Sequence, residues 1–264
     1  MAIDKVVIYQ NTSVLHDEIL AHRLGLLPIL ANPDLFEFRE ENEVFNETNT
    51  LKFSINAKCI RKTEFSKDEN LAESDLPFDS YLENHYIYAS HMVWEPIGDQ
   101  AVSFKGQNIK ILHDKILIAK LAENQEFEAE VYCTKNIGKI HTKWSPVSTA
   151  FYRLFPTVKI VTQVTGKDAQ DIKSLCPTGV FDIEDIKGSK EKQLVVSDEN
   201  KCTTCRACIN HEVLGDSFEL GKEQNRYHFT IESIGVIEPN RIFAKALEVL
   251  REKAAFYQKF LKTS

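Results

Sequence analysis

Apolar and polar residues alternate along two segments in the first half of the chain, 51–59 and 127–133. A period of two places the apolar side chains on one face of an extended strand and the polar ones on the other. Both segments are therefore predicted to be half-buried strands. Shorter apolar runs around 6–8, 86–88 and 92–94 predict further strands in the same region.

A short helix is predicted over residues 17–24, with acidic residues in its first turn and a base in its last. That order suits the helix dipole. Gly25 is expected just after the helix, where it would adopt a positive φ, and Pro28 prevents the helix from resuming.

The second half of the chain has a different character. The β-branched segment 158–162 and the segment 227–233 are predicted to be extended. Between them, residues 165–219 are cysteine-bearing and rich in turns, which indicates a small inserted domain. Pro146 and Pro156 are expected to mark the exit from the preceding strand region.

A C-terminal helix is predicted from about residue 240 to 261, with Pro239 at its first position. Its apolar stripe at helical spacing is Phe243, Ala246, Leu247, Leu250, Ala254, Tyr257, Phe260 and Leu261. Two interpretations of the stripe stay open from the pattern alone: packing on the chain's own sheet, or contact with a partner subunit.

Composition places these elements in an ordinary globular α+β protein of 264 residues, with 43% apolar and 27% charged residues. The net charge of -7 argues against a free-standing DNA-binding protein, which usually carries a basic excess. Neither an apolar run long enough to span a membrane nor a basic signal-peptide start is seen. The six cysteines are therefore expected in a reducing compartment, where clustered cysteines favour metal binding over disulfides.

Three of those cysteines, Cys202, Cys205 and Cys208, have the C-x2-C-x2-C spacing of a bacterial-type ferredoxin. The fourth ligand in that motif comes from a distant Cys-Pro, and this chain has one at Cys176. A second cluster would need a cysteine where Glu212 stands. The spacing therefore predicts one iron–sulfur cluster, [4Fe–4S] or [3Fe–4S].

Zinc competes for the same four thiolates, and a metal-free loop is the third alternative. Zinc is less favoured, because zinc ribbons usually present two separate CxxC knuckles. Electron transfer is the enzymatic interpretation of a cluster, but the chain has no G-x-G-x-x-G fingerprint for a redox cofactor. A cluster that only holds the small insert together is the alternative. Cys59 and Cys133 lie in strand patterns and are predicted to be core residues.

No catalytic residue is assigned. Asp182 and Glu184 would share a strand face, but a solvated hairpin is favoured over a two-metal site. Lys135, Lys139, His141 and Lys143 form a basic loop that is expected to touch a partner protein or, less favoured, a nucleic acid.

Several long motifs resemble, in order, those of the α-like subunits of multisubunit DNA-directed RNA polymerases. They are the segments 11–29, 113–119, 138–147 and 229–235. The segment 81–104 resembles the branch shared by polymerases I and III, and the zinc-binding cysteine group of the polymerase II paralogue is not seen. The archaeal counterpart, which keeps a four-cysteine ferredoxin-like insert, is the alternative.

The resemblance implies a dimerisation domain split by two insertions. Its parts would be 1–30, 151–164 and 220–264, with an inserted mainly-β domain at 31–150 and a ferredoxin-like insert at 165–219.

It also implies a non-catalytic subunit that pairs with a smaller α-like subunit and carries the large catalytic subunits, with only indirect DNA contact. The residues expected at the partner interface are Ile19, Leu20, Leu24, Phe243, Leu247, Leu250, Tyr257, Phe260 and Leu261.

Members of the family carry a strand and an arginine-containing helix before the position of Met1. The resemblance therefore implies that the N-terminal portion is lacking. A nuclear location, nucleolus and nucleoplasm, is expected for the branch shared by polymerases I and III. A cytoplasmic location is expected for the archaeal one.

Overall fold

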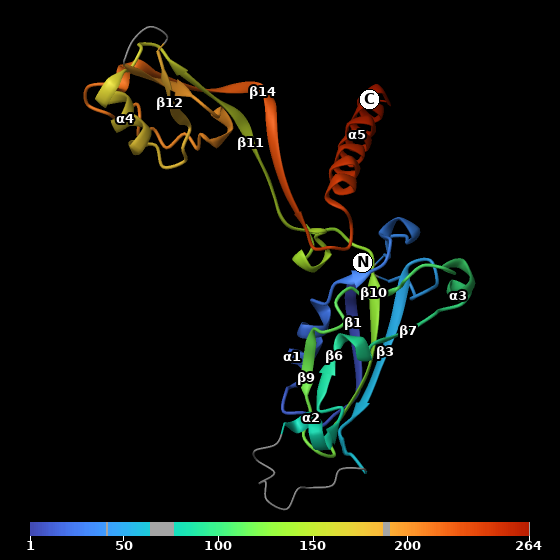
Figure 1. Cartoon of the computed structure of the whole chain (residues 1–264). Helices are drawn as coiled ribbons and strands as arrows, with labels where there is room; N and C mark the ends of the chain where they lie inside the picture. Colours follow the sequence, from blue (N-terminus) through green and yellow to red (C-terminus); the bar gives the residue numbers. More distant parts are fainter. Residues whose placement is uncertain (41, 64–76, 187–190, 264) are drawn as a thin grey trace, which may run out of the picture. The chain divides into compact units, whose positions relative to one another are not determined.

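The computed structural model describes residues 1–40, 42–63, 77–186 and 191–263 (Figure 1). The chain forms two compact units: unit 1 is Met1–Ser148 with Glu232–Ser264, and unit 2 is Thr149–Ile231. Helices and strands occur together in the chain, which confirms the α+β class. Among the described residues, no helix combines the length and apolar character that crossing a bilayer requires.

Unit 1 is built on an antiparallel sheet in the order β1-β10-β3-β7. Its strands are β1 (Ala2–Asn11), β3 (Thr50–Lys58), β7 (Val93–Glu95) and β10 (Glu126–Thr134). The alternation predicted for β3 and β10 is confirmed, because their inward side chains, such as Phe53 and Phe127, are fully buried. This face of the sheet forms the main core of unit 1.

Short elements surround that sheet. The two-stranded pairs are β2 (Ile29–Leu30) with β8 (Lys110–Ile111), β4 (Ile60–Arg61) with β5 (Leu82–Glu83), and β6 (Tyr86–Tyr88) with β9 (Leu117–Lys120). The helices of unit 1 are α1 (Asp17–Gly25), α2 (Phe78–Tyr81), α3 (Gln100–Ser103) and α5 (Pro239–Thr263). Helix α1 packs against β1 and β9, and α5 begins at Pro239 as predicted.

The end of α1 differs from the prediction. Gly25 is the last helical residue and does not adopt a positive φ. Leu26 closes the helix in an ordinary right-handed conformation, with φ -93°; its N–H donates to the Arg23 carbonyl, and the Leu27 N–H donates to the Leu24 carbonyl. This closure needs no left-handed residue, so the conformational freedom of glycine is not used here.

Residues 1–30 and 31–150 share one sheet and one core, since β1 pairs with β10 along its length and Leu20 and Leu24 join the same cluster. The division of these residues between a dimerisation domain and an inserted domain stays a prediction.

Unit 2 contains α4 (Gly166–Leu175) and the antiparallel hairpin of β12 (Phe181–Asp185) and β13 (Lys192–Val196). The long strands β11 (Val147–Ile160) and β14 (Phe218–Ser233) pair with each other as a two-stranded ribbon (Figure 1). Pro156 lies inside β11, so the prediction that it marks a break is wrong. A strand with one neighbour leaves N–H groups on its outer edge unpaired, where proline is tolerated.

The core of unit 2 is small. Among its described residues, eight apolar side chains are buried, including Ile172, Phe181 and Phe218. Cys176, Cys202 and Cys208 are partly buried against this cluster. A core of this size gives limited stability by itself, and small units often depend on a metal or disulfide staple.

Candidate functional site

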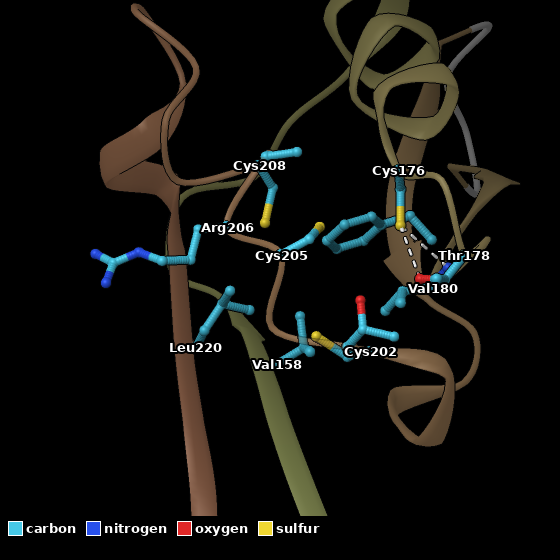
Figure 2. A pocket seen from close by; sticks show the side chains of 12 residues that line it. Val158, Cys176, Thr178, Val180, Cys202, Cys205, Arg206, Cys208 and Leu220 are labelled. Carbon is cyan, nitrogen blue, oxygen red and sulfur yellow. Dashed lines mark hydrogen bonds between the residues drawn. The ribbon is translucent and has the colours of Figure 1, made fainter.

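The four cysteines singled out by spacing line one pocket of unit 2 (Figure 2). The remaining lining residues are Val158, Thr178, Val180, Phe181, Thr203, Arg206, Ala207 and Leu220. In Figure 2 the triple-cysteine loop approaches from one side and Cys176 from the other, while the Arg206 side chain points away from the sulfurs. Two segments distant in sequence are thus brought to one site.

Cys176 is placed by the end of α4. It is the C-cap residue, and its N–H donates to the Ile172 carbonyl. A tight turn follows in which Gly179 adopts φ +64°, a conformation that costs glycine little. The turn carries the Val180 N–H back to the Cys176 sulfur, with N and Sγ 3.4 Å apart.

Hydrogen bonding around Cys176 favours its thiolate. Burial alone would raise the thiol pKa, but the N–H groups of Val180, Thr178 and Gly179, with the Thr178 hydroxyl, together outweigh burial and lower it. Donors aimed at a sulfur stabilise its charged form. The thiolate is the form that binds metals.

Val180 also connects the two cysteine segments. Its carbonyl accepts hydrogen bonds from the N–H groups of Ser197, at 2.9 Å, and Asp198, at 3.3 Å. The Asp198 side chain caps the single 3-10 turn Glu199–Lys201, which ends at Cys202. The position of the triple-cysteine loop is therefore tied to the turn that holds Cys176.

The loop that carries Cys202, Cys205 and Cys208 has an unusual backbone. Thr204 and Arg206 both adopt left-handed conformations, with φ 55° and 67°. Such a conformation is rare for a β-branched residue and costs on the order of 1–3 kcal/mol. The Thr204 N–H donates to the Cys202 sulfur, with N and Sγ 3.4 Å apart. Concave backbones with left-handed residues and inward N–H groups recur at anion and iron–sulfur sites.

Four cysteine thiolates are a donor set that both iron–sulfur clusters and zinc accept. Within the described part of the chain, no three His, Cys, Asp or Glu side chains are grouped closely enough to hold one metal ion. The four sulfurs instead stand around the walls of the pocket. A zinc ion needs all four sulfurs at about 2.3 Å, whereas a cluster occupies the space between more widely spaced thiolates.

The pKa of the Cys208 thiol shifts in the opposite direction to that of Cys176. Burial raises the pKa of the Cys208 thiol, and the charges of Cys202 and Cys205 raise it further. Thiolates that share a partly buried site repel one another, and a cationic metal centre offsets that repulsion.

Cys59 and Cys133 are buried in the core of unit 1, as predicted. Burial raises the pKa of the Cys133 thiol strongly, so it remains a protonated, packing side chain.

Most of the expected interface residues on α5 are exposed. The exposed fractions are 53% for Leu247, 64% for Leu250 and Tyr257, 62% for Phe260 and 75% for Leu261, while Phe243 is half-buried. Contiguous exposed apolar side chains of this size indicate a surface that another molecule covers.

The start of α5 is fixed to the rest of unit 1. The Asp34 carboxylate accepts from Lys245 Nζ at 2.7 Å and from Arg241 Nη2 at 2.8 Å. Lys245, followed by Arg241, lowers the pKa of the Asp34 carboxyl. The exposed stripe therefore continues from the first two turns of α5, which are anchored.

On α1 the expected interface is corrected. Leu20 and Leu24 are fully buried in the core of unit 1 and offer no surface to a partner. Only Ile19 is exposed, at 45%. The pattern of the helix could not show which of its apolar side chains the sheet covers.

The ribbon of unit 2 carries an aromatic group that was not predicted from the sequence. Tyr152 on β11 packs against Tyr227 and Phe229 on β14, with ring centroids 5.6 and 5.7 Å apart, yet about half of each side chain is exposed. The spacing of Tyr227 and Phe229, two positions apart on a strand, was the available signal. On α5, Val249 and Phe256 are also exposed outside the predicted stripe.

The basic loop is mostly used internally. Lys143 Nζ donates to the Ile3 carbonyl at 2.8 Å and lies 4.3 Å from the centre of the Trp144 ring. Lys135 Nζ donates to the Phe36 carbonyl, also at 2.8 Å. These two ammonium groups stabilise unit 1, so the expectation of a basic contact loop is corrected for both.

Asp182 is paired with Lys173, Nζ to Oδ1 2.8 Å, on the exposed β12–β13 hairpin. This salt bridge matches the favoured interpretation of these acids as a solvated hairpin.

Residues 6–151 match the family model described as the RNA polymerase Rpb3/RpoA insert domain. The chain is 40% identical to the mouse protein named DNA-directed RNA polymerases I and III subunit RPAC1, over 96% of this chain and 71% of the relative. It is 35% identical to the Saccharomyces cerevisiae protein of the same name, over 97% and 75%. Identity to the archaeal DNA-directed RNA polymerase subunit Rpo3 of Methanosphaera stadtmanae is 30%, over 96% and 82%.

Proposed function

The chain belongs to the α-like subunits of DNA-directed RNA polymerases, on the branch shared by polymerases I and III, and we propose that it works as their assembly subunit. It is non-catalytic within a nucleotidyltransferase complex. It pairs with a smaller α-like subunit, and the pair forms the platform for the large catalytic subunits. The complexes transcribe ribosomal and small RNAs.

The observation that carries this proposal is the likeness to the shared subunits over nearly the whole chain, at 35–40% identity. The archaeal relative is less similar, at 30%, which favours the eukaryotic assignment over an archaeal one. A polymerase I and III subunit works in the nucleus, and the polymerase I fraction is proposed to lie in the nucleolus.

Two exposed surfaces support pairing with a smaller α-like subunit. One is the stripe on α5, which includes Leu247, Leu250 and Tyr257, and the other is the aromatic group on the β11–β14 ribbon. Burying a leucine or an aromatic side chain at an interface contributes roughly 1.5–3 kcal/mol. Both surfaces are available for this purpose in the described chain.

The pocket of unit 2 is proposed to hold one iron–sulfur cluster, [4Fe–4S] or [3Fe–4S], through Cys176, Cys202, Cys205 and Cys208, in a ferredoxin-like insert. Zinc is the alternative metal. A bound [4Fe–4S] cluster would supply four metal–thiolate bonds, and a [3Fe–4S] cluster three; bonds that include Cys176 would close the triple-cysteine loop onto the turn after α4. The role of the cluster is structural, because unit 2 has a small core and metal binding adds directly to folding free energy.

The test of the assembly function is a pull-down of the tagged full chain from its own cells, with identification of the co-purifying proteins by mass spectrometry. A small α-like subunit and the large subunits of both polymerases I and III are expected. Large subunits of a single polymerase would contradict the shared role, and recovery of none would contradict the assembly role itself. A tagged unrelated nuclear protein of similar charge serves as the control.

A further inference from the structure

The four sulfurs of the cysteine pocket are not equivalent in their hydrogen bonds. Cys176 lies 26 positions before Cys202 and is held by its own turn. Its sulfur lies 3.4 Å from the Val180 nitrogen and 3.7 Å from the Thr178 hydroxyl oxygen (Figure 2), in addition to the backbone N–H groups of Thr178 and Gly179. Within the part of the chain that the structure describes, Thr178 is the one residue whose side chain hydrogen-bonds a sulfur of this set.

The direction of that hydrogen bond follows from the state of the sulfur. A cysteine that binds a metal is a thiolate and has no proton to donate. The Thr178 hydroxyl must then be the donor, and the Cys176 sulfur the acceptor. Thr178 is half-buried in the pocket wall, where competition from water is reduced.

We propose that Thr178 is a positioning residue that holds the Cys176 sulfur toward the pocket and raises the reduction potential of the cluster bound there. This inference rests on the cluster proposed above. A hydrogen bond to a ligand sulfur withdraws electron density from the cluster and stabilises its more negative, reduced state. The Val180 N–H acts in the same direction, but it belongs to the backbone and is present whichever side chains surround it.

A matched substitution is available in the same pocket. Thr203 also lines it, but no hydrogen bond joins its hydroxyl to a cysteine sulfur among the described residues. Thr178→Val and Thr203→Val therefore make the same chemical change, the replacement of a hydroxyl by a methyl group, with and without a sulfur contact. Thr178→Ser keeps the hydroxyl and is the conservative variant.

The experiment uses the full chain, purified without oxygen and supplied with ferrous iron and sulfide. Iron, acid-labile sulfide and zinc are measured first, and the visible absorption is then followed through a redox titration. We expect Thr178→Val to keep its iron and to show a more negative potential. The expected effect is a roughly tenfold fall in the ratio of reduced to oxidised cluster at a fixed solution potential. For a one-electron couple this equals a reduction potential about 59 mV more negative. Thr178→Ser and Thr203→Val are expected to titrate like the wild type.

The outcomes distinguish the role of Thr178 from the proposed cluster and from the proposed assembly function. A wild-type chain that binds only zinc, or no metal, overturns the cluster and this role of Thr178 together, while the pull-down still decides the assembly function. An iron-containing Thr178→Val chain with the wild-type potential overturns the role of Thr178 alone. Loss of iron from Thr178→Val but not from Thr178→Ser would overturn the effect on potential and leave the hydroxyl a purely structural role.

Discussion

Lys52 lies between two carboxylates on the polar face of the four-stranded sheet. Its Nζ is 2.7 Å from Glu130 on β10 and 2.9 Å from Glu95 on β7. Glu130 also accepts hydrogen bonds from the hydroxyls of Tyr132, at 2.8 Å, and Tyr9, at 3.1 Å. One residue on β3 thus joins its two neighbouring strands, and Tyr9 adds β1 through Glu130.

The pKa values of Lys52 and Glu130 shift in opposite directions, and each shift favours the charged form of the side chain. Glu130, followed by Glu95, raises the pKa of Lys52. Lys52, followed by the Tyr132 hydroxyl, lowers the pKa of Glu130 below its ordinary value of 4.5. Because the folded pKa of Glu130 is depressed, its stabilising contribution is complete above pH 4.5 and is lost as the pH falls through the folded value.

Lys52→Met is expected to lower the free energy of unfolding at neutral pH by about 0.5–1 kcal/mol, the scale of a partly exposed ion pair. The difference from wild type should shrink below pH 4.5, as Glu130 becomes protonated. Urea unfolding at low salt, at about pH 7 and about pH 3.5, measures both values. Lys58→Met is the control on the same strand, since Lys58 forms a more exposed pair with Glu126 and should matter less. A pH-independent difference would contradict this account.

Helix α5 and the ribbon of β11 and β14 carry apolar side chains that the chain itself leaves exposed. The first two turns of α5 are held by Asp34, but the apolar residues beyond them, such as Leu247 and Leu250, are exposed. Strand β11 also has an unpaired edge, because proline has no N–H to donate and Pro156 is tolerated only where a strand edge lacks a neighbour.

Leu247→Glu combined with Leu250→Glu is expected to reduce recovery of the smaller α-like subunit at least about tenfold, which corresponds to a loss of about 1.4 kcal/mol of binding free energy. Both side chains are exposed, so unfolding of the chain alone should change by less than about 0.5 kcal/mol. Co-expression and quantitative pull-down measure the first quantity, and thermal unfolding of the chain the second.

Ala255→Glu provides the control, since five residues turn the helix by about 140° and place it well away from Leu250. Ala255 is exposed as well. If Ala255→Glu weakened pairing as much as the leucine variant does, a general effect of negative charge on α5 would replace the stripe as the explanation.

At the scale of the whole molecule, the chain has two units with separate cores. The core of unit 1 includes buried residues from β1, β3, β10 and α1. Unit 2 has the smaller core and the four-cysteine pocket. A metal centre in that pocket would therefore affect the stability of one unit and leave the other unchanged.

Removing the cluster is expected to lower the unfolding temperature of unit 2 by several degrees and to leave the transition of unit 1 in place. Calorimetry of the iron-loaded chain before and after treatment with a chelator and a mild oxidant measures both transitions. The variant with all four pocket cysteines replaced by serine should match the treated chain. Cys133→Ala should keep the iron-dependent transition of unit 2, because Cys133 lies in the core of unit 1. A shift of both transitions together would argue against independent units.

The sequence by itself determined the features that depend on local spacing. The alternation at 51–59 and 127–133 fixed β3 and β10, and Pro239 with the stripe behind it fixed α5. The motifs also identified the family, because their order along the chain is a property of the sequence alone. For the cysteines, spacing named the four candidate ligands and predicted one iron–sulfur cluster, which stays a prediction.

Tertiary structure decided which residues share a surface. It buried Leu20 and Leu24 under the chain's own core and turned the amine of Lys143 inward to a carbonyl. It also brought Cys176 to the triple-cysteine loop and aimed the Thr178 hydroxyl at its sulfur. These outcomes depend on contacts between residues far apart along the chain, and local periodicity carries no information about which distant segments will meet.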